Sequence, residues 1–267
     1  MEIQSLKLVC FSPTGTTKRV IQGIARGINH RSMESIDFTR PDARKQQLLI
    51  NENDLLVVAV PVYMGRVPAL LMDCLHKIKA NNTPTVCVVV YGNREYDDAL
   101  HELKDILTQQ GCKTIAGAAF VGEHSFSGFG LPIAEGRPDA RDINQAELFG
   151  RKLSERLQSV SSVDFISEIN VPGNYPYGGV TKLWDVDFIE VSDACTQCES
   201  CAETCPVGAI DSQNRNSVDI EKCITCCACI KSCPQSGRTI KPSLVKDAAL
   251  RLNRLYGEQK QPEFFLN

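Results

Sequence analysis

The sequence has no long apolar run, no basic N-terminal segment and no excess of positive charge. Its first residues are Met1-Glu2-Ile3-Gln4, with an acidic residue where a secretory signal needs positive charge. No apolar stretch approaches the roughly 20 residues of a membrane span; Leu55–Val62 is among the longest. These features favour a cytoplasmic protein without a membrane span. The formal net charge of −3 makes nucleic acid a poor expectation for the partner.

Cysteine is the residue type in excess. Nine of the 13 cysteines fall between Cys195 and Cys233, in a chain of 267 residues. A disulfide framework is typical of small secreted domains, whereas this chain has no secretory signal, an odd number of cysteines and regular spacing. The cluster of cysteines therefore indicates metal rather than disulfides.

The cysteines form a repeat of two similar runs, each ending in Cys-Pro. The runs are Cys195-x2-Cys198-x2-Cys201-x3-Cys205-Pro206 and Cys223-x2-Cys226-x2-Cys229-x3-Cys233-Pro234. Thiolates are soft ligands suited to iron–sulfur clusters, and in two-cluster proteins the fourth ligand comes from the other run. We therefore assign Cys195, Cys198, Cys201 and Cys233 to one [4Fe–4S] cluster, and Cys223, Cys226, Cys229 and Cys205 to a second.

Zinc is the alternative, because it also binds four thiolates. Zinc fingers pair CxxC motifs and do not need triple runs that end in Cys-Pro, so the spacing favours iron. Cys227 is surplus to both runs and is interpreted as a bystander. The region resembles the bacterial two-cluster ferredoxins over about 50 residues, although the segment after the second run, Pro234–Ile240, is two residues longer than the family pattern.

The first part of the chain alternates apolar runs with stretches typical of helices. Strands are expected at Leu6–Phe11, Ser35–Phe38, Leu55–Val60, Thr85–Tyr91 and Ile115–Val121, and helices at Thr17–Asn29, Pro68–Lys79, Asp97–Gln110 and Arg141–Leu157. This pattern predicts an α/β fold with a doubly wound, five-stranded parallel sheet, in which ligands bind beyond the carboxyl ends of the strands.

The loop after the first strand carries hydroxyls and a glycine directly before a helix. It reads Ser12-Pro13-Thr14-Gly15-Thr16-Thr17, a composition that suits phosphate at a helix N-terminus, although a simple helix cap is the alternative. GxGxxG and the Walker lysine are missing, so neither a dinucleotide nor a triphosphate is indicated.

In this context the loop resembles the FMN phosphate loop of the flavodoxins. The resemblance implies phosphate contacts from Ser12, Thr14, Gly15, Thr16 and Thr17. It implies flavin-ring contacts from two later loops. The expected residues there are Pro61, Val62, Tyr63, Met64, Gly65, Tyr91, Gly92, Asn93, Arg94 and Tyr96, with Gly122 after the fifth strand. Each tyrosine has an alternative as a packed amphipathic side chain.

The whole chain resembles the flavodoxin–ferredoxin fusion proteins of anaerobes, in which FMN and two [4Fe–4S] clusters share one polypeptide. The expected division is residues 1–160 for a flavodoxin-like domain, 161–186 for a linker, 187–240 for a small α+β dicluster ferredoxin domain and 241–267 for a C-terminal helix and tail. The turn-rich linker around Tyr175–Tyr177 is either an inert spacer or a functional lid.

The resemblance implies electron transfer between the clusters and FMN, and three functions stay open. The first is an iron–sulfur flavoprotein oxidoreductase that reduces a small molecule at the flavin. The second is an electron relay that docks to a redox partner, which the 11 acidic against 5 basic residues of positions 161–240 would suit if that partner were basic. The third is a non-redox module with structural metal. Substrate and oligomeric state are not indicated.

The loop after the fifth strand offers catalytic candidates. Glu123 and His124 lie at the ligand edge of the predicted sheet and together could relay a proton to a substrate. A hydrogen-bonded structural pair is the alternative.

Arg66 and Arg94 occupy the two expected ring loops. A cation beside the flavin stabilises the anionic reduced form by the charge logic that shifts a pKa. We expect Arg94→Ala to lower the two-electron midpoint potential of the flavin, measured by spectroelectrochemistry. An unchanged potential would show that Arg94 is a surface residue without influence on the flavin.

Overall fold

A computed structural model describes residues 1–128, 130–180, 186–214 and 216–266. Five parallel strands form its central sheet, in the order β7-β6-β4-β1-β2. Their bounds are Cys112–Val121, Thr83–Tyr91, Asp54–Pro61, Ser5–Cys10 and Met33–Asp37. The sheet confirms the predicted doubly wound α/β fold, because apolar cores cover both of its faces.

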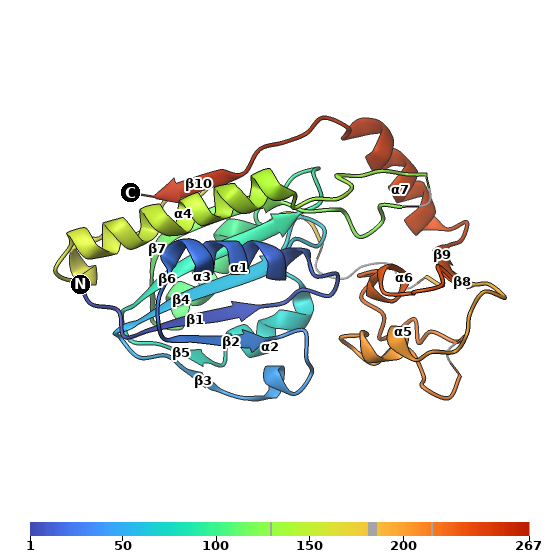
Figure 1. The fold of residues 1–267 in the computed structure, drawn as a ribbon, viewed down its shortest axis with the longest axis horizontal. Helices are drawn as coiled ribbons and strands as arrows, with labels where there is room; N and C mark the ends of the chain where they lie inside the picture. The colour runs from blue at the N-terminus through green and yellow to red at the C-terminus, as the bar shows by residue number, and fades with distance from the viewer. Residues whose placement is uncertain (129, 181–185, 215, 267) are drawn as a thin grey trace.

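Helices pack on the two faces in the way that continuous apolar strands require. Figure 1 shows α1 (Thr16–Ile28) and α4 (Ala140–Ser159) side by side on one face, where Ile24 and Phe149 are fully buried. The other face is covered by α3 (Ala99–Gln109) and by a short turn formed by η2 (Ala69–Leu71) and α2 (Met72–Leu75). None of the described helices is long and apolar enough to span a membrane.

The helix expected over Pro68–Lys79 is wrong in extent. The chain leaves α2 after Leu75, and β5 (Ile78–Lys79) pairs in parallel with β3 (Leu48–Leu49), after η1 (Ala43–Lys45). Ile78 is fully buried, and its strand offers backbone hydrogen bonds to the 48–50 segment. This non-local pairing outweighs local helix propensity.

The segment expected as a linker packs against the sheet domain as far as it is described. After η3 (Val163–Phe165), Ile169 donates its backbone N–H to Thr114, and Ile169 and Val171 are buried in the core. Tyr177 then donates its hydroxyl to Asp105 on α3 at 2.6 Å. Residues 181–185 of the expected linker lie outside the described residues.

The cysteine-rich unit runs from β8 (Ile189–Val191) to β9 (Arg238–Ile240), which pair antiparallel. It contains two one-turn helices, α5 (Ser200–Glu203) and α6 (Ala228–Lys231), one within each cysteine run. Figure 1 shows the unit at the end of the sheet toward which the parallel strands point. It therefore lies at the edge where ligands of such sheets bind.

The chain returns from the cysteine-rich unit to the sheet. Helix α7 (Leu244–Leu255) packs on the unit through Val245 and Ala249, and β10 (Glu263–Leu266) then adds antiparallel to β7 as a sixth strand. The expected C-terminal tail is thus partly a strand that covers the edge of β7. We call residues 256–266 the C-terminal strap; it runs along the top of Figure 1.

Glycines set the distance between α1 and α4. A Cβ on Gly150 would lie 2.2 Å from the carbonyl oxygen of Ile24, and one on Gly27 would lie 2.0 Å from that of Glu147. The two helix backbones therefore approach too closely for any side chain at these positions.

We expect Gly150→Ala to destabilise the protein by about 1–3 kcal/mol, as overpacking does, although alanine is the better helix former. Urea unfolding would measure the change. Gly257→Ala is the matched control, because a Cβ there meets only the Asn253 carbonyl oxygen at 4.0 Å. Equal stabilities of the two variants would contradict this account of the helix contact.

Candidate functional site between the sheet edge and the cysteine-rich unit

A cavity of about 630 Å³ lies at the carboxyl edge of the sheet, a volume typical of small-molecule sites. Four loops of the sheet domain line it, and the cysteine-rich unit and α7 complete its wall. The residues that line the cavity include Ser12, Thr14, Thr16, Thr17, Pro61, Val62, Tyr63, Met64, Gly65, Tyr91, Gly92, Arg94, Glu95, Gly122, Glu123, His124, Phe126, Thr225, Leu244, Asp247, Ala248, Arg251, Leu252 and Tyr256.

The first loop fits a phosphate group. Gly15 has φ 84°, a left-handed conformation that suits glycine, and the space where its Cβ would stand is open. Ser12 orients the loop by accepting the backbone N–H of Lys18 at 3.0 Å. The hydroxyl of Thr17 is buried and has no partner among the described residues. This hydroxyl and the free backbone N–H groups at the N-terminus of α1 are hydrogen-bond donors of the kind that a phosphate needs.

The second loop is a tight turn in which Tyr63 and Arg66 exchange backbone hydrogen bonds. Met64 and Gly65 both have positive φ, and a Cβ on Gly65 would lie 2.4 Å from an Asp97 carboxylate oxygen. The turn thus holds Tyr63 and Met64 at the cavity wall. Burial raises the pKa of Tyr63 well above its usual value, with the nearby cysteine thiols adding to the effect, so the phenol keeps its proton.

The third loop places Tyr91, Gly92 and Arg94 in the wall but turns two expected residues away. A Cβ on Gly92 would lie 2.2 Å from the ring of His124, so the two loops meet there. Tyr96 donates its hydroxyl to Glu263 at 2.8 Å and packs edge-on against Tyr91.

Asn93 is buried and bound entirely by the C-terminal strap. Its amide nitrogen donates to the carbonyl oxygens of Tyr256 and Glu258, each at 2.7 Å, and its oxygen accepts the backbone N–H of Lys260. Neither Asn93 nor Tyr96 belongs to the cavity wall, and the side chains of both residues support the loop. Flavin contacts from these two residues stay a prediction.

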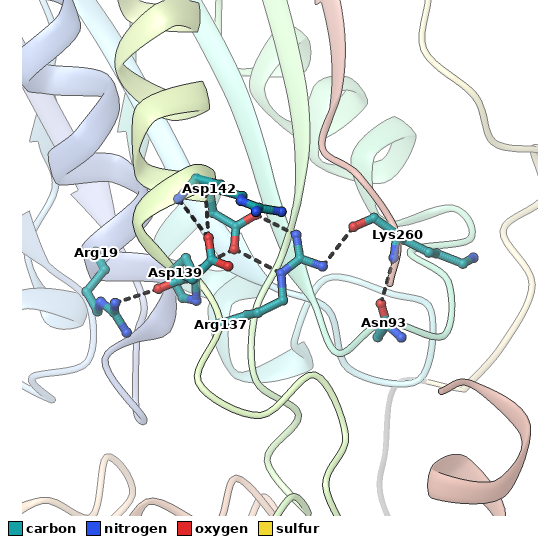
Figure 2. Close-up of polar contacts among 8 residues, drawn as sticks. Arg19, Asn93, Arg137, Asp139, Asp142 and Lys260 are labelled. Atoms are coloured by element: carbon teal, nitrogen blue, oxygen red, sulfur yellow. Dashed lines mark hydrogen bonds and ion pairs between the residues drawn. The ribbon is translucent and has the colours of Figure 1, made fainter. Parts of the chain in front are cut away.

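Figure 2 shows how this support continues into the sheet domain. Arg137 donates to the carbonyl oxygen of Lys260 at 2.7 Å and forms a two-point ion pair with Asp142. Asp142 also closes a capping box with Asp139 at the start of α4. The side-chain amine of Lys260 binds the carbonyl oxygen of Arg94 at 2.6 Å and the carboxylate of Glu95. The third loop is therefore clamped from both sides.

Arg66 does not face the cavity. Its guanidinium forms a two-point ion pair with Glu102 at 2.6 and 2.8 Å and lies 4.9 Å from the ring centre of Tyr177. The charge of Arg66 is thus paired with Glu102 outside the cavity wall, and its influence on a flavin stays a prediction. Arg94 does line the cavity, where its side chain pairs with Asp97.

Glu123 and His124 lie at the cavity but do not act as a pair. Glu123 accepts the backbone N–H of Gly136 at 3.0 Å and forms an ion pair with Lys231 of α6. Lys231 also donates to the carbonyl oxygen of Ser127 at 2.7 Å, so this group docks the cysteine-rich unit onto the fourth loop. The carboxylate of Glu123 is thus engaged in docking, and its part in a proton relay stays a prediction.

His124 accepts the backbone N–H of Phe126 at its Nδ1, at 3.0 Å. Desolvation, aided by the cations of Lys231 and Arg94, lowers the pKa of His124 to about 4. The ring is therefore neutral at pH 7, with its proton on Nε2. It can donate a hydrogen bond into the cavity but is not charged.

The four cysteines expected to hold the first cluster lie together, because Cys195, Cys198, Cys201 and Cys233 line one small hollow. In the second expected set, burial raises the pKa of the Cys223, Cys226 and Cys229 thiols, and the neighbouring Cys205 thiol adds to the rise.

Both fourth ligands accept a backbone N–H four residues on, from Ala209 to Cys205 at 3.3 Å and from Gly237 to Cys233 at 3.2 Å. Such N–H groups tune the sulfurs of iron–sulfur clusters. Within the described residues, no three His, Cys, Asp or Glu side chains are grouped to hold a single metal ion. In a [4Fe–4S] cluster, by contrast, each thiolate binds a different iron.

The two runs differ in what surrounds them. Cys198 is exposed in the first run, whereas Cys226 and Cys229 are buried in the second. Ile224 packs against the core of the sheet domain, and Thr225 lines the cavity. Cys227 is buried beside the second run with φ 57°, and its thiol contacts the carbonyl oxygen of Thr225 at 3.8 Å.

Sequence reasoning missed the part of the wall that the second half of the chain supplies. Leu244, Ala248 and Leu252 of α7 face the cavity at helical spacing. The helical spacing of these three residues is visible in the sequence, but spacing alone does not show which surface the helix covers.

Family models match two separate parts of the chain. Residues 188–234 match the 4Fe-4S dicluster domain, and residues 16–126 match the NADPH-dependent FMN reductase family. The chain joins a flavodoxin-like FMN reductase domain to a 4Fe–4S dicluster domain. Both domain types transfer electrons, one through a flavin and the other through iron–sulfur clusters.

Solved structures match the flavodoxin-like domain. A flavodoxin from the domain Archaea is 14% identical, with 58% of this chain and 99% of that chain covered and a TM-score of 0.39. A Streptococcus pneumonia TIGR4 flavodoxin is 16% identical, with 57% and 99% covered and a TM-score of 0.39. Rubredoxin oxygen:oxidoreductase from the anaerobe Desulfovibrio gigas is 11% identical, with 59% and 37% covered and a TM-score of 0.42. No curated protein matches the chain.

The lowered pKa of His124 predicts a pH-dependent stability. The contribution of His124 to the free energy of unfolding is complete above about pH 6.5, where the histidine of the unfolded chain is also neutral. It is lost as the pH falls toward the pKa of the folded state. We expect the free energy of unfolding to lose about 1 kcal/mol between pH 7 and pH 5.5 through this group.

Urea unfolding at the two pH values would measure the loss, and His124→Gln should remove it. His76→Gln, at an exposed position, is the control and should keep the pH dependence of the wild type. An unchanged pH dependence in His124→Gln would contradict a neutral, desolvated ring.

Proposed function

We propose that this protein is an iron–sulfur flavoprotein oxidoreductase that passes electrons between two [4Fe–4S] clusters and FMN and reduces a small-molecule acceptor at the flavin. One observation carries the proposal. The cavity bounded by the phosphate loop and the ring loops has Thr225, from within the second cysteine run, as part of its wall. The two predicted redox sites thus share a boundary, which a relay between them requires.

The residues that would hold each group are assigned as follows. Ser12, Thr14, Thr16 and Thr17 would bind the FMN phosphate, with Gly15 leaving room for it. The loops of Pro61–Gly65 and Tyr91–Arg94, with Gly122, would hold the ring, without side-chain contact from Asn93. The clusters would take the two cysteine sets described above. When bound, these groups supply one-electron transfer through iron and two-electron chemistry at the flavin.

The chain's own residues prepare this site in three ways. The apolar side chains of Leu244, Ala248 and Leu252 give the cavity an apolar wall on the α7 side, which would limit the access of water to a bound flavin. Tyr63 keeps its phenol proton and stays uncharged. His124, neutral at pH 7, donates a hydrogen bond from Nε2 toward an acceptor instead of acting as a charged acid.

A pure electron relay is the second candidate. The α7 residues that line the cavity narrow the space left for a small substrate, which would suit a site that serves protein partners only. The exposed Cys198 and the surrounding acidic residues Asp193, Glu199 and Glu203 would then face a basic redox partner. Turnover with small oxidants such as quinones or nitro compounds would separate the two candidates.

Protein purified without oxygen should contain about eight irons and one flavin per chain. Stepwise reduction by a one-electron donor should consume about four electrons, one for each cluster and two for FMN. Iron assay, flavin release on denaturation and a reductive titration would measure these quantities. Zinc in place of iron, without released flavin, would overturn the proposal.

A further inference from the structure

Thr225 combines three properties that the cysteine pattern does not require. It lies between Cys223 and Cys226 of the dicluster domain, it is 3% exposed, and it lines the cavity. Its hydroxyl has no hydrogen-bond partner among the described residues. A buried hydroxyl without a partner is costly unless something absent from the protein itself satisfies it.

The backbone of Thr225 follows the conformation of the cysteine runs. Its φ of 55° is left-handed, a conformation that is unfavourable for a β-branched residue and suits glycine or asparagine, and it belongs to the run and not to the cavity. Gln197 occupies the corresponding position of the first run with the same φ of 55°, but it is exposed and lines the separate cysteine hollow. The two runs therefore differ at this position in what they face.

We propose that Thr225 binds the flavin: its hydroxyl is the contact that the dicluster domain makes with the cofactor held by the flavodoxin-like domain. This inference rests on the proposed function, since it needs a flavin in the cavity. It also places the second cysteine set (Cys223, Cys226 and Cys229, with Cys205) nearer to the flavin than the first set. Ile224 supports this order, because it is the neighbour of Thr225 and packs against the core of the sheet domain.

Replacing the hydroxyl tests the proposal in the complete, iron-loaded protein. Thr225→Val removes the hydroxyl at nearly constant shape and should weaken FMN binding about threefold to tenfold, the range for one lost hydrogen bond. Thr225→Ser keeps the hydroxyl and should bind FMN as the wild type does. The measurement is the dissociation constant of FMN, from fluorescence quenching on return of FMN to flavin-depleted protein, with iron content determined in parallel.

Two further variants separate binding from folding. Thr225→Gly suits the left-handed conformation, so its melting temperature should not fall while its FMN binding weakens as in Thr225→Val. Thr114→Val is the matched control, because it removes another fully buried hydroxyl without a described partner, from β7 and outside the cavity lining. Its affinity for FMN should equal that of the wild type.

The outcomes distinguish this inference from the proposed function. If the wild type binds no FMN, the proposed function and this inference both fail. If the wild type binds FMN and Thr225→Gly and Thr225→Val bind it equally well, this inference alone is overturned. If Thr225→Val loses iron, the comparison of Thr225→Ser with Thr225→Gly decides, because the affinity for FMN should stay high only in the variant that keeps the hydroxyl.

Discussion

The cavity depends on the hydrogen bonds that Asn93 makes with the C-terminal strap. One buried amide satisfies both of its N–H groups and its oxygen on the backbone of residues 256–260. Because those residues join α7 to β10, the same contacts hold the 91–96 loop and fix where α7 leaves the dicluster domain. Loss of any partner would leave a buried amide group unpaired, which is why such networks are rigid when complete.

The strap turns two covalently joined domains into one site. The chain leaves the flavodoxin-like domain through the 161–178 segment, which is packed along α3 and β7, and it returns through β10. The dicluster domain is thus tied to the sheet at both of its ends, and the Glu123–Lys231 ion pair docks it between them. With both ends held, Ile224 of the second run packs against the sheet core and Thr225 lines the cavity, whereas Cys198 of the first run is exposed.

The fold class could be predicted, and the two cysteine runs could be recognised, because their signals are local. Strands buried on both faces are continuous apolar runs, and two-residue gaps bring thiols around one cluster whatever surrounds them. The helix expected at Pro68–Lys79 failed since pairing of Ile78 with Leu48 comes from a distant segment. The two expected ring loops both line the cavity, but Arg66, Asn93 and Tyr96 turn toward Glu102, the strap and Glu263, which are 36 to 167 residues away.

By itself, the sequence determined the alternation of strands and helices, the hydroxyl-rich loop before α1 and the two cysteine runs, since each is written in short-range spacing. Only the tertiary structure decided which cysteine run borders the cavity, that α7 supplies part of its wall and that His124 is neutral. These properties depend on burial and on partners from distant segments. The direction of a side chain and its charge state follow from this packing, which no local sequence pattern encodes.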